Sequence, residues 1–204
     1  LSKKSNSKNQ STLKASSFDY IVAIGTSTGG PKALQTVLSK LPKDFPAPLV
    51  IVQHMPSGFT KSLAKRLNEQ CHITVKEAVD GESLEAGKAY IAPGNYHMEV
   101  KEDFTILINQ KEERSGHRPS VNVLLESIAG LDDLKKIVVI LTGMGKDGTA
   151  GMKRIQETGG YTIAQDKETS VVFGMPRQAI QRGVIDEILS LEEICKKVAQ
   201  IVRR

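Results

Sequence analysis

Three polar side chains follow three strongly apolar runs, and together they could carry out acyl transfer. Ser27 lies in GTSTGG, directly after the run YIVAI, while His54 and Asp147 follow the runs PLVIVQ and KIVVIL. A hydroxyl nucleophile, an imidazole base and a carboxylate that orients the imidazole are the parts of a serine hydrolase triad. The order Ser, His, Asp differs from that of α/β-hydrolases, which argues against that fold but not against the chemistry.

Simpler interpretations exist for the first two of these residues. Ser27 could cap a helix that starts near Pro31, and His54 could be a structural histidine bonded to a carbonyl group. GTSTGG matches the nucleophile-turn pattern G-x-S-x-G, but it also has the glycines of a phosphate cradle. A Walker-type phosphate loop is excluded here, because Ala33 follows Lys32 where a metal-binding hydroxyl is required.

Asp147 has a sharper rival interpretation. It lies in GMGKDG, a formal G-x-G-x-x-G that follows an expected strand, opens an expected helix and precedes Asp166 at the spacing of a dinucleotide-binding fingerprint. The fingerprint normally opens a mononucleotide-binding half, whereas here too few residues remain for a second half. From the residues alone, the triad and the dinucleotide site both stay open.

The elements that would position these side chains alternate along the chain. Strands are expected at 19–24, 48–53, 88–92, 104–108, 136–141 and 161–165. Helices are expected at 31–40, 59–69, 120–129, 148–157, 176–181 and 191–203. Buried strands separated by helices predict an α/β fold with a mostly parallel, doubly wound, Rossmann-like sheet flanked by helices. The stretch 72–108 has short strands and no clear helix, which predicts an antiparallel β excursion at a sheet edge.

Composition narrows the class of protein. Of 204 residues, 39% are hydrophobic and 25% are charged, and no apolar run reaches the roughly 20 residues of a membrane span. Nothing resembles a signal peptide, so a cytoplasmic location without direct membrane insertion is predicted. Residues 1–17 are rich in Ser, Lys and Asn and predict a polar linker or tail, which leaves 18–204 as the folded domain.

The net charge and the cysteines argue against a nucleic-acid-binding protein and against a disulfide scaffold. Much of the net charge of +5 comes from lysines in 1–17, and only 4% of residues are aromatic, so a nucleic-acid-binding surface is not expected. Cys71 and Cys195 lie far apart, and no His, Cys or carboxylate cluster has metal-ligand spacing. His72 and His97 are expected to be surface or hydrogen-bonded polar residues.

Six longer blocks carry a resemblance to one family. IGTSTGGP, VQHMPSGFTKSLAKRL, AYIAPGNYHMEV, GHRPSVNVLLESIA, LTGMGKDGTAG and VVFGMPRQAI resemble, in this order, the catalytic domain of the chemotaxis protein-glutamate methylesterases (CheB-type). The resemblance runs from about residue 18 to about residue 202. Thr26 stands where a smaller residue is expected, and Asn122 where an acid is expected.

The resemblance implies an activity and roles for the three residues. It implies hydrolysis of γ-glutamyl methyl esters on the cytoplasmic helices of methyl-accepting chemoreceptors, with release of methanol, and deamidation of certain receptor glutamines. Ser27 would be the nucleophile, His54 the general base and acid, and Asp147 its orienting partner. GTSTGG is then a nucleophile turn, and no metal or organic cofactor is needed.

Four other residues complete the expected site. Acyl transfer needs donors for an oxyanion, and we expect the backbone N–H groups of Thr28 and Met144 to supply them. His117 and Arg118, in a loop before an expected helix, are expected to face the substrate.

Family members usually carry a receiver domain, which is expected upstream of residues 1–17.

Overall fold

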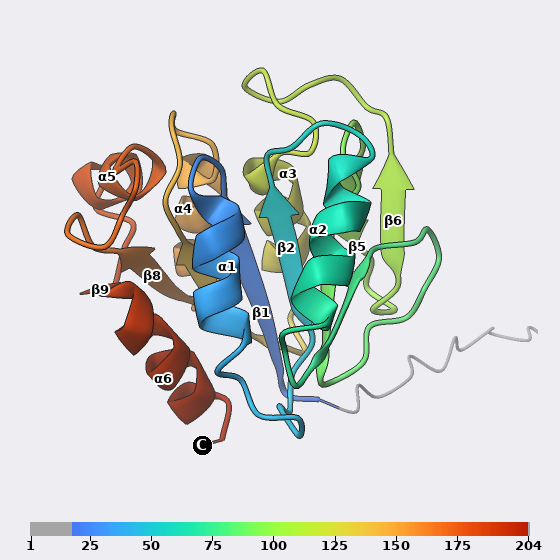
Figure 1. The fold of residues 1–204 in the computed structure, drawn as a ribbon. Helices are drawn as coiled ribbons and strands as arrows, with labels where there is room; N and C mark the ends of the chain where they lie inside the picture. Colours follow the sequence, from blue (N-terminus) through green and yellow to red (C-terminus); the bar gives the residue numbers. More distant parts are fainter. Residues whose placement is uncertain (1–17, 204) are drawn as a thin grey trace, which may run out of the picture.

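A seven-stranded sheet forms the centre of the molecule. The computed structural model describes residues 18–203, so the predicted linker 1–17 lies outside the described residues. The sheet runs through the middle of the molecule (Figure 1). Its strand order is β3-β4-β2-β1-β7-β8-β9, and every neighbouring pair is parallel. The strands are β1 (Tyr20–Thr26), β2 (Leu49–Gln53), β3 (Thr74–Glu77), β4 (Lys88–Ile91), β7 (Lys135–Ile140), β8 (Tyr161–Gln165) and β9 (Glu187–Leu189).

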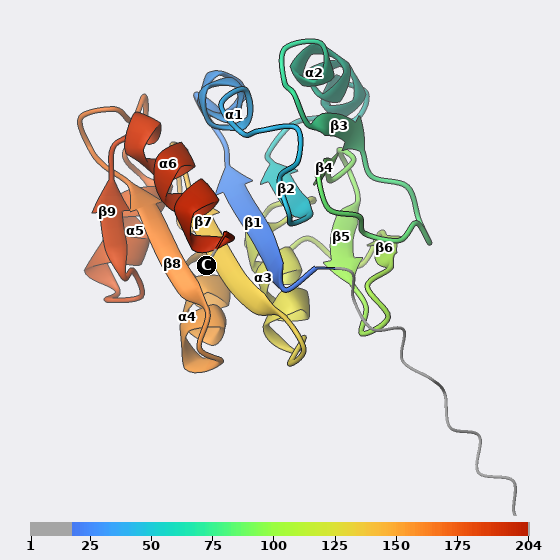
Figure 2. The ribbon, with the colours of Figure 1, turned by 90° about the horizontal axis from the view of Figure 1, so that it is seen from below.

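Helices cover both faces of this sheet, as seen from below in Figure 2. One layer comprises α1 (Gly30–Leu38), α2 (Phe59–Asn68) and α6 (Leu191–Ile201). The other comprises α3 (Val121–Ala129), α4 (Thr149–Glu157), α5 (Met175–Gln181) and an antiparallel pair, β5 (His97–Val100) and β6 (Ile106–Asn109). The doubly wound α/β prediction is confirmed.

The alternation of strand side chains explains the two layers. Successive residues of a strand point to opposite faces, so a strand covered on both sides must be apolar throughout. In β1, Ile21 and Ala23 join the core under α3, α4 and α5, whereas Val22 and Ile24 join the core under α1, α2 and α6. All four side chains are at most 1% exposed.

The order of the strands places β1 at the point where the chain changes direction across the sheet. From β1 the chain moves to β2 on one side, and it later returns to β7 on the other. In the register, Gly25 of β1 lies opposite Val52 of β2 and Ile140 of β7. Ligands of open α/β sheets bind at the carboxyl ends of strands near such a switch, so this edge is where a site is expected.

The middle of the chain differs from the expectation in one respect. An antiparallel pair does occur, but only β5 and β6 form it, while β3 and β4, also within 72–108, join the main sheet as parallel strands. The reason is burial: Val75, Ala89 and Ile91 pack in the core on the side of α1 and α2. Three strands, β3, β5 and β9, are additional to those expected.

Within residues 18–203, no helix has both the length and the apolar character needed to cross a bilayer.

Candidate active site

The loops after β1, β2 and β7 carry Ser27, His54 and Asp147, and hydrogen bonds hold these loops side by side. The amide of Ser27 donates to the carbonyl of Thr142 at 3.0 Å, and the amide of His54 donates to the carbonyl of Thr26 at 3.1 Å. These bonds continue the sheet ladder beyond the ends of the strands. The three residues predicted from their separate strands therefore lie at one edge of the sheet.

The three helices that follow these loops begin in the same way. Gly29, Gly58 and Gly148 are the N-cap residues of α1, α2 and α4, with φ values of 84°, 85° and 95°, and no side chain caps these helices. Glycine adopts this left-handed conformation without steric cost. Helix α6, in contrast, has a capping box made by Ser190 and Glu193. The loops at the site thus each enter their helix through a left-handed glycine and present the positive ends of helix dipoles.

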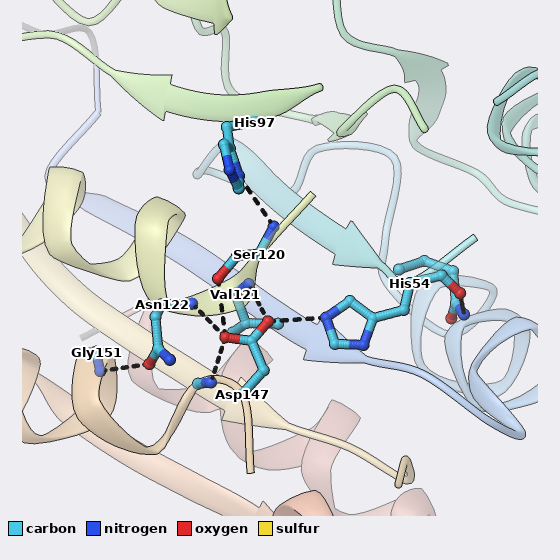
Figure 3. Close-up of polar contacts among 9 residues, drawn as sticks. His54, His97, Ser120, Val121, Asn122, Asp147 and Gly151 are labelled. Atoms are coloured by element: carbon cyan, nitrogen blue, oxygen red, sulfur yellow. Dashed lines mark hydrogen bonds and ion pairs between the residues drawn. The ribbon is translucent and has the colours of Figure 1, made fainter. Parts of the chain in front are cut away.

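Asp147 occupies a cage of hydrogen-bond donors (Figure 3). The residue is 1% exposed, and both oxygens of its carboxylate accept several bonds. Oδ1 accepts from the Ser120 hydroxyl at 2.9 Å, the Asn122 amide at 3.1 Å and the Gly148 amide at 3.0 Å. Oδ2 accepts from the Val121 amide at 2.7 Å and from His54 Nε2 at 2.8 Å. We call these five donors the Asp147 cage.

The cage keeps Asp147 charged. Burial acts to raise the pKa of the carboxyl group, but the hydrogen bonds from His54, Asn122 and Val121 outweigh it, so the pKa lies below its ordinary value. Two of those bonds come from the N-terminus of α3, which has no acidic residue in its own first turn. The carboxylate therefore supplies the negative charge that a helix N-terminus favours. At neutral pH, Asp147 is ionised.

The ionised carboxylate fixes the tautomer of His54. A carboxylate only accepts hydrogen bonds, so Nε2 of His54 must carry the proton that it shares with Asp147. Nδ1 of His54 then has a free lone pair, and it is buried without a partner among the described residues. In the chymotrypsin triad the imidazole contacts aspartate through Nδ1 instead. Here the nitrogen available as a base is Nδ1.

Ser27 and His54 line the same cavity, of about 410 Å³, together with Thr28, Gln53 and Phe59. Ser27 is half-buried and Thr28 is exposed. Within the described part of the chain, the amides of Thr28 and Met144 donate to no protein acceptor. The cavity is thus lined by a residue with a hydroxyl, a histidine with an unpaired nitrogen and one residue with an unpaired amide, Thr28, whereas Met144 lines a second cavity.

Gln53 joins the loop that carries Ser27 to the loop that carries His54. Its side-chain Nε2 donates to the carbonyl of Ser27 at 3.0 Å and to the carbonyl of His54 at 3.0 Å. The residue is 2% exposed, and a Cβ at Gly30 would collide with its amide group. We expected no role for Gln53 from the sequence. The available signal was a polar residue closing an otherwise apolar, fully buried strand.

His117 covers one face of the His54 ring. The two rings stack with centroids 3.9 Å apart and planes 8° from parallel. Burial and the neighbouring His54 lower the pKa of His117, although Asp147 acts in the opposite direction. A neutral His117 is compatible with a protonated His54 during a reaction, because no second charge is added. His117 therefore lies against the ring of His54, and its expected substrate-facing role stays a prediction.

Arg118 is engaged in hydrogen bonds with the chain that precedes α3. Its guanidinium group donates to Oδ1 of Asn95, at 2.9 Å from one terminal nitrogen, and to the main-chain carbonyls of Gln110 and Lys111. These contacts hold the loop 110–118 together. The substrate-facing role of Arg118 stays a prediction.

Large exposed apolar side chains gather around the site. Phe59, 63% exposed, lines the cavity of Ser27, and Met144, 71% exposed, lines a neighbouring cavity of about 590 Å³ with His117 and Asp147. Val171, 66% exposed, lies where a side chain at position 29 would be. Exposed apolar groups around a concave site are typical of surfaces that bind another molecule.

The dinucleotide interpretation of GMGKDG does not fit the geometry. The amide of Gly148, which a pyrophosphate would need, already donates to the carboxylate of Asp147. Asp166, the expected ribose ligand, accepts from the amide of Thr169 in a local turn. In residues 18–203, no three His, Cys, Asp or Glu residues gather in an arrangement that could hold a metal ion.

Known proteins resemble this chain over nearly all of its described length. The family model described as CheB methylesterase matches residues 22–198. A protein-glutamate methylesterase/protein-glutamine glutaminase from Halalkalibacterium halodurans is 53% identical over 90% of this chain and 54% of its own length, and one from Bacillus subtilis is 48% identical over 90% and 53%. The crystal structure of the Thermotoga maritima CheB methylesterase catalytic domain has a TM-score of 0.87 and 47% identity, covering 90% of this chain and 98% of that one. The chain spans about half the length of the curated relatives that it matches.

Proposed function

The chain belongs to the CheB methylesterase family, and from that premise we propose that it hydrolyses γ-glutamyl methyl esters on the cytoplasmic helices of chemoreceptors, with Ser27, His54 and Asp147 as its triad. The products are a glutamate side chain and methanol. The enzyme would act in the cytoplasm, and the receiver domain expected upstream stays a prediction. The proposal covers glutamine deamidation as well, because the relatives are named for both activities.

The acylation step follows from the tautomer of His54. Nδ1 takes the proton of the Ser27 hydroxyl as Oγ attacks the ester carbonyl carbon. The imidazole becomes positively charged while Nε2 keeps its bond to the ionised Asp147. His54 then returns the proton to the departing methoxide, which leaves as methanol, and an acyl bond joins the glutamyl group to Ser27.

The negative oxygen formed in this step needs donors. The unpaired amides of Thr28 and Met144 lie in the loops that adjoin the nucleophile, and α1 contributes the positive end of its dipole. Loss of one such donor typically costs roughly 3–4 kcal/mol of barrier stabilisation. Water activated by His54 then cleaves the acyl bond, which yields glutamate and restores the serine.

Deamidation uses the same intermediate. Attack of Ser27 on the side-chain amide of a glutamine gives the same acyl group, with ammonia in place of methanol as the leaving group. His54 supplies the proton that ammonia needs to depart. One acyl-enzyme therefore accounts for both activities.

A single observation carries the proposal: Nε2 of His54 is bound to an ionised, buried Asp147, while Nδ1 is buried without a partner and His54 lines the same cavity as Ser27. A histidine that merely supported the fold would have both nitrogens satisfied, because leaving a buried polar group unpaired is costly. This arrangement favours a base that waits for a proton.

Methanol release from methylated chemoreceptor membranes tests the proposal. We expect release by the parent protein and by Ser57→Ala, which removes an exposed serine from the neighbouring loop, but none by Ser27→Ala. Equal release by the Ser27 variant would move the nucleophile elsewhere. Binding to the membranes without any release would favour a receptor-docking module instead, and a nucleotide-induced rise in Tm would revive the dinucleotide interpretation.

A further inference from the structure

A buried histidine outside the proposed triad is connected to it through hydrogen bonds (Figure 3). His97 is the first residue of β5 and is fully buried. Its Nδ1 accepts a hydrogen bond from the amide of Ser120 at 3.2 Å, and its Nε2 donates to the carbonyl of Glu112 at 3.0 Å. Both ring nitrogens are therefore used by main-chain groups of the segment that leads into α3.

These two partners determine the state of the ring. An amide N–H can only donate, so Nδ1 must be unprotonated, and a carbonyl can only accept, so Nε2 must carry the proton. His97 is a neutral imidazole of one tautomer, with no unpaired nitrogen. His54 also carries its proton on Nε2, but its Nδ1 has no partner.

Ser120 carries the connection from His97 to the triad. Its amide donates to His97, while its hydroxyl donates to Oδ1 of Asp147 at 2.9 Å. Ser120 stands at the N-cap of α3 with extended backbone angles, yet its side chain does not cap that helix. The next two amides of the chain, at Val121 and Asn122, also donate to Asp147. The position of the Ser120 backbone thus controls three of the five donors in the Asp147 cage.

We propose that His97 is a positioning residue for the triad: by holding the Ser120 amide, it aims the Ser120 hydroxyl and the first amides of α3 at Asp147, which in turn holds the His54 ring. The antiparallel pair β5–β6 then has a purpose in the site, because it places His97 beneath α3. The kinetic part of this inference rests on the proposed function, whereas its structural part does not.

Pure core packing would not explain the two bonds. An apolar side chain of similar volume would fill the same space, but it would leave a buried amide and a buried carbonyl without partners. The question is whether the bond to Ser120 matters to the triad or only to the fold. Two substitutions separate these roles, because each keeps one of the two bonds.

His97→Asn and His97→Gln form the matched pair. The Asn Oδ1 atom takes the place of ring Nδ1 and can accept from Ser120, while the Gln Nε2 atom takes the place of ring Nε2 and can donate to Glu112. We expect His97→Asn to keep kcat for methanol release within about threefold of the parent. We expect His97→Gln to lower kcat by up to about 100-fold, the size of effect that a small misplacement of a reacting group produces, with KM unchanged.

A spectroscopic measurement needs no substrate. Ring ¹⁵N chemical shifts of His54 should report a single Nε2–H tautomer in the parent and in His97→Asn, and a mixture in His97→Gln. Ser120→Ala, which leaves β5 untouched, should shift the tautomer in the same direction as His97→Gln. The inference is overturned if the two His97 variants lose kcat equally, or if the His54 tautomer stays pure in His97→Gln and in Ser120→Ala. Absence of methanol release from the parent would instead contradict the proposed function, and the tautomer measurement would still decide the inference.

Discussion

The two sides of the site are built on opposite plans. On the acid side, the carboxylate of Asp147 is buried and receives five hydrogen bonds from four main-chain or hydroxyl donors and one imidazole. On the other side, which we call the nucleophile side after the proposed role of Ser27, Ser27 is half-buried, Thr28 is exposed, and the amides expected to receive the oxyanion have no partner in the described chain. The hydrogen-bonding groups of the acid side are paired, whereas amide donors of the nucleophile side are left unpaired.

The difference follows from what each side has to do. Asp147 keeps one charge throughout the proposed reaction, so fixed donors can satisfy it permanently. The nucleophile side meets a charge that exists only in the transition state, so its donors must be free beforehand and already in place. His54 joins the two sides, with one nitrogen satisfied and the other unpaired.

The sharpest test of this contrast compares Asp147→Asn with Ser27→Ala. Both should abolish most activity, with kcat falling by on the order of 10⁴ or more. Only Asp147→Asn should also lower the free energy of unfolding, on the order of 3 kcal/mol, because an amide cannot accept from all five donors. Activity assays would measure kcat, and urea unfolding would measure the free energy of unfolding, for each of the two variants.

A suitable control for that pair is Asp166→Asn, since Asp166 accepts from Thr169 in a local turn outside the Asp147 cage. We expect it to leave kcat near the parental value. Equal unfolding free energies for Asp147→Asn and Ser27→Ala would break the contrast between the two sides.

Replacement of Gln53 should have an intermediate effect. Gln53→Met keeps the volume but removes the bonds to the carbonyls of Ser27 and His54. We expect kcat to fall about tenfold, since the two loops would lose the contact that sets their separation. Gln156→Met, at an exposed position on α4, is the matched control and should change nothing. If the Gln53 variant has parental kcat, the nucleophile side is held by its main-chain bonds alone.

The acid side also predicts how stability depends on pH. The pKa of Asp147 is lowered in the folded protein, so its charged form adds stability above the ordinary carboxyl value of about 4. That contribution is lost as the pH falls through the lowered pKa of the folded state. Urea unfolding between neutral and strongly acidic pH should therefore show a smaller decline in Asp147→Asn than in the parent. An identical decline in both would mean that the cage does not stabilise the charge.

The smallest effect is expected at the outer edge of the nucleophile side. Phe59→Ser removes an exposed ring from the cavity that Ser27 lines. We expect KM for receptor substrate to rise severalfold with kcat unchanged, and unfolding free energy to change by less than about 0.5 kcal/mol. Val79→Ser, at a similarly exposed site in the loop between β3 and β4, should leave KM unaltered. Matching KM values for the two variants would remove Phe59 from the binding surface.

The predictability of the site divides along the same line. The nucleophile turn is local, because a strand, a G-x-S-x-G turn and a helix follow one another within 20–38. Ser27, His54 and Asp147 could each be proposed from the strand before them, and parallel pairing of adjacent strands brings their loops together. The strands β1, β2 and β7 were strongly apolar and were predicted to within one or two residues.

The cage could not be predicted in this way. Ser120 lies 27 positions from Asp147 and 23 from His97, and although it belongs to the block GHRPSVNVLLESIA, nothing in that block indicates these contacts. The parallel pairing of β3 with β4 was missed for a similar reason, because short strands do not reveal their direction. The approach of α3 depends on Gly25, where any Cβ would collide with Val121. Such packing becomes visible only in three dimensions.

The glycine caps of α1, α2 and α4 have a consequence for heat stability. Glycine loses more backbone freedom on folding than any other residue, and these three N-caps also lack the side-chain bond that secures α6. Opening the edge of the sheet that carries the site would therefore return backbone freedom to three glycines without breaking a side-chain cap. Local opening should begin there. Warming should therefore abolish activity at a temperature at which the two cores beneath the site remain folded.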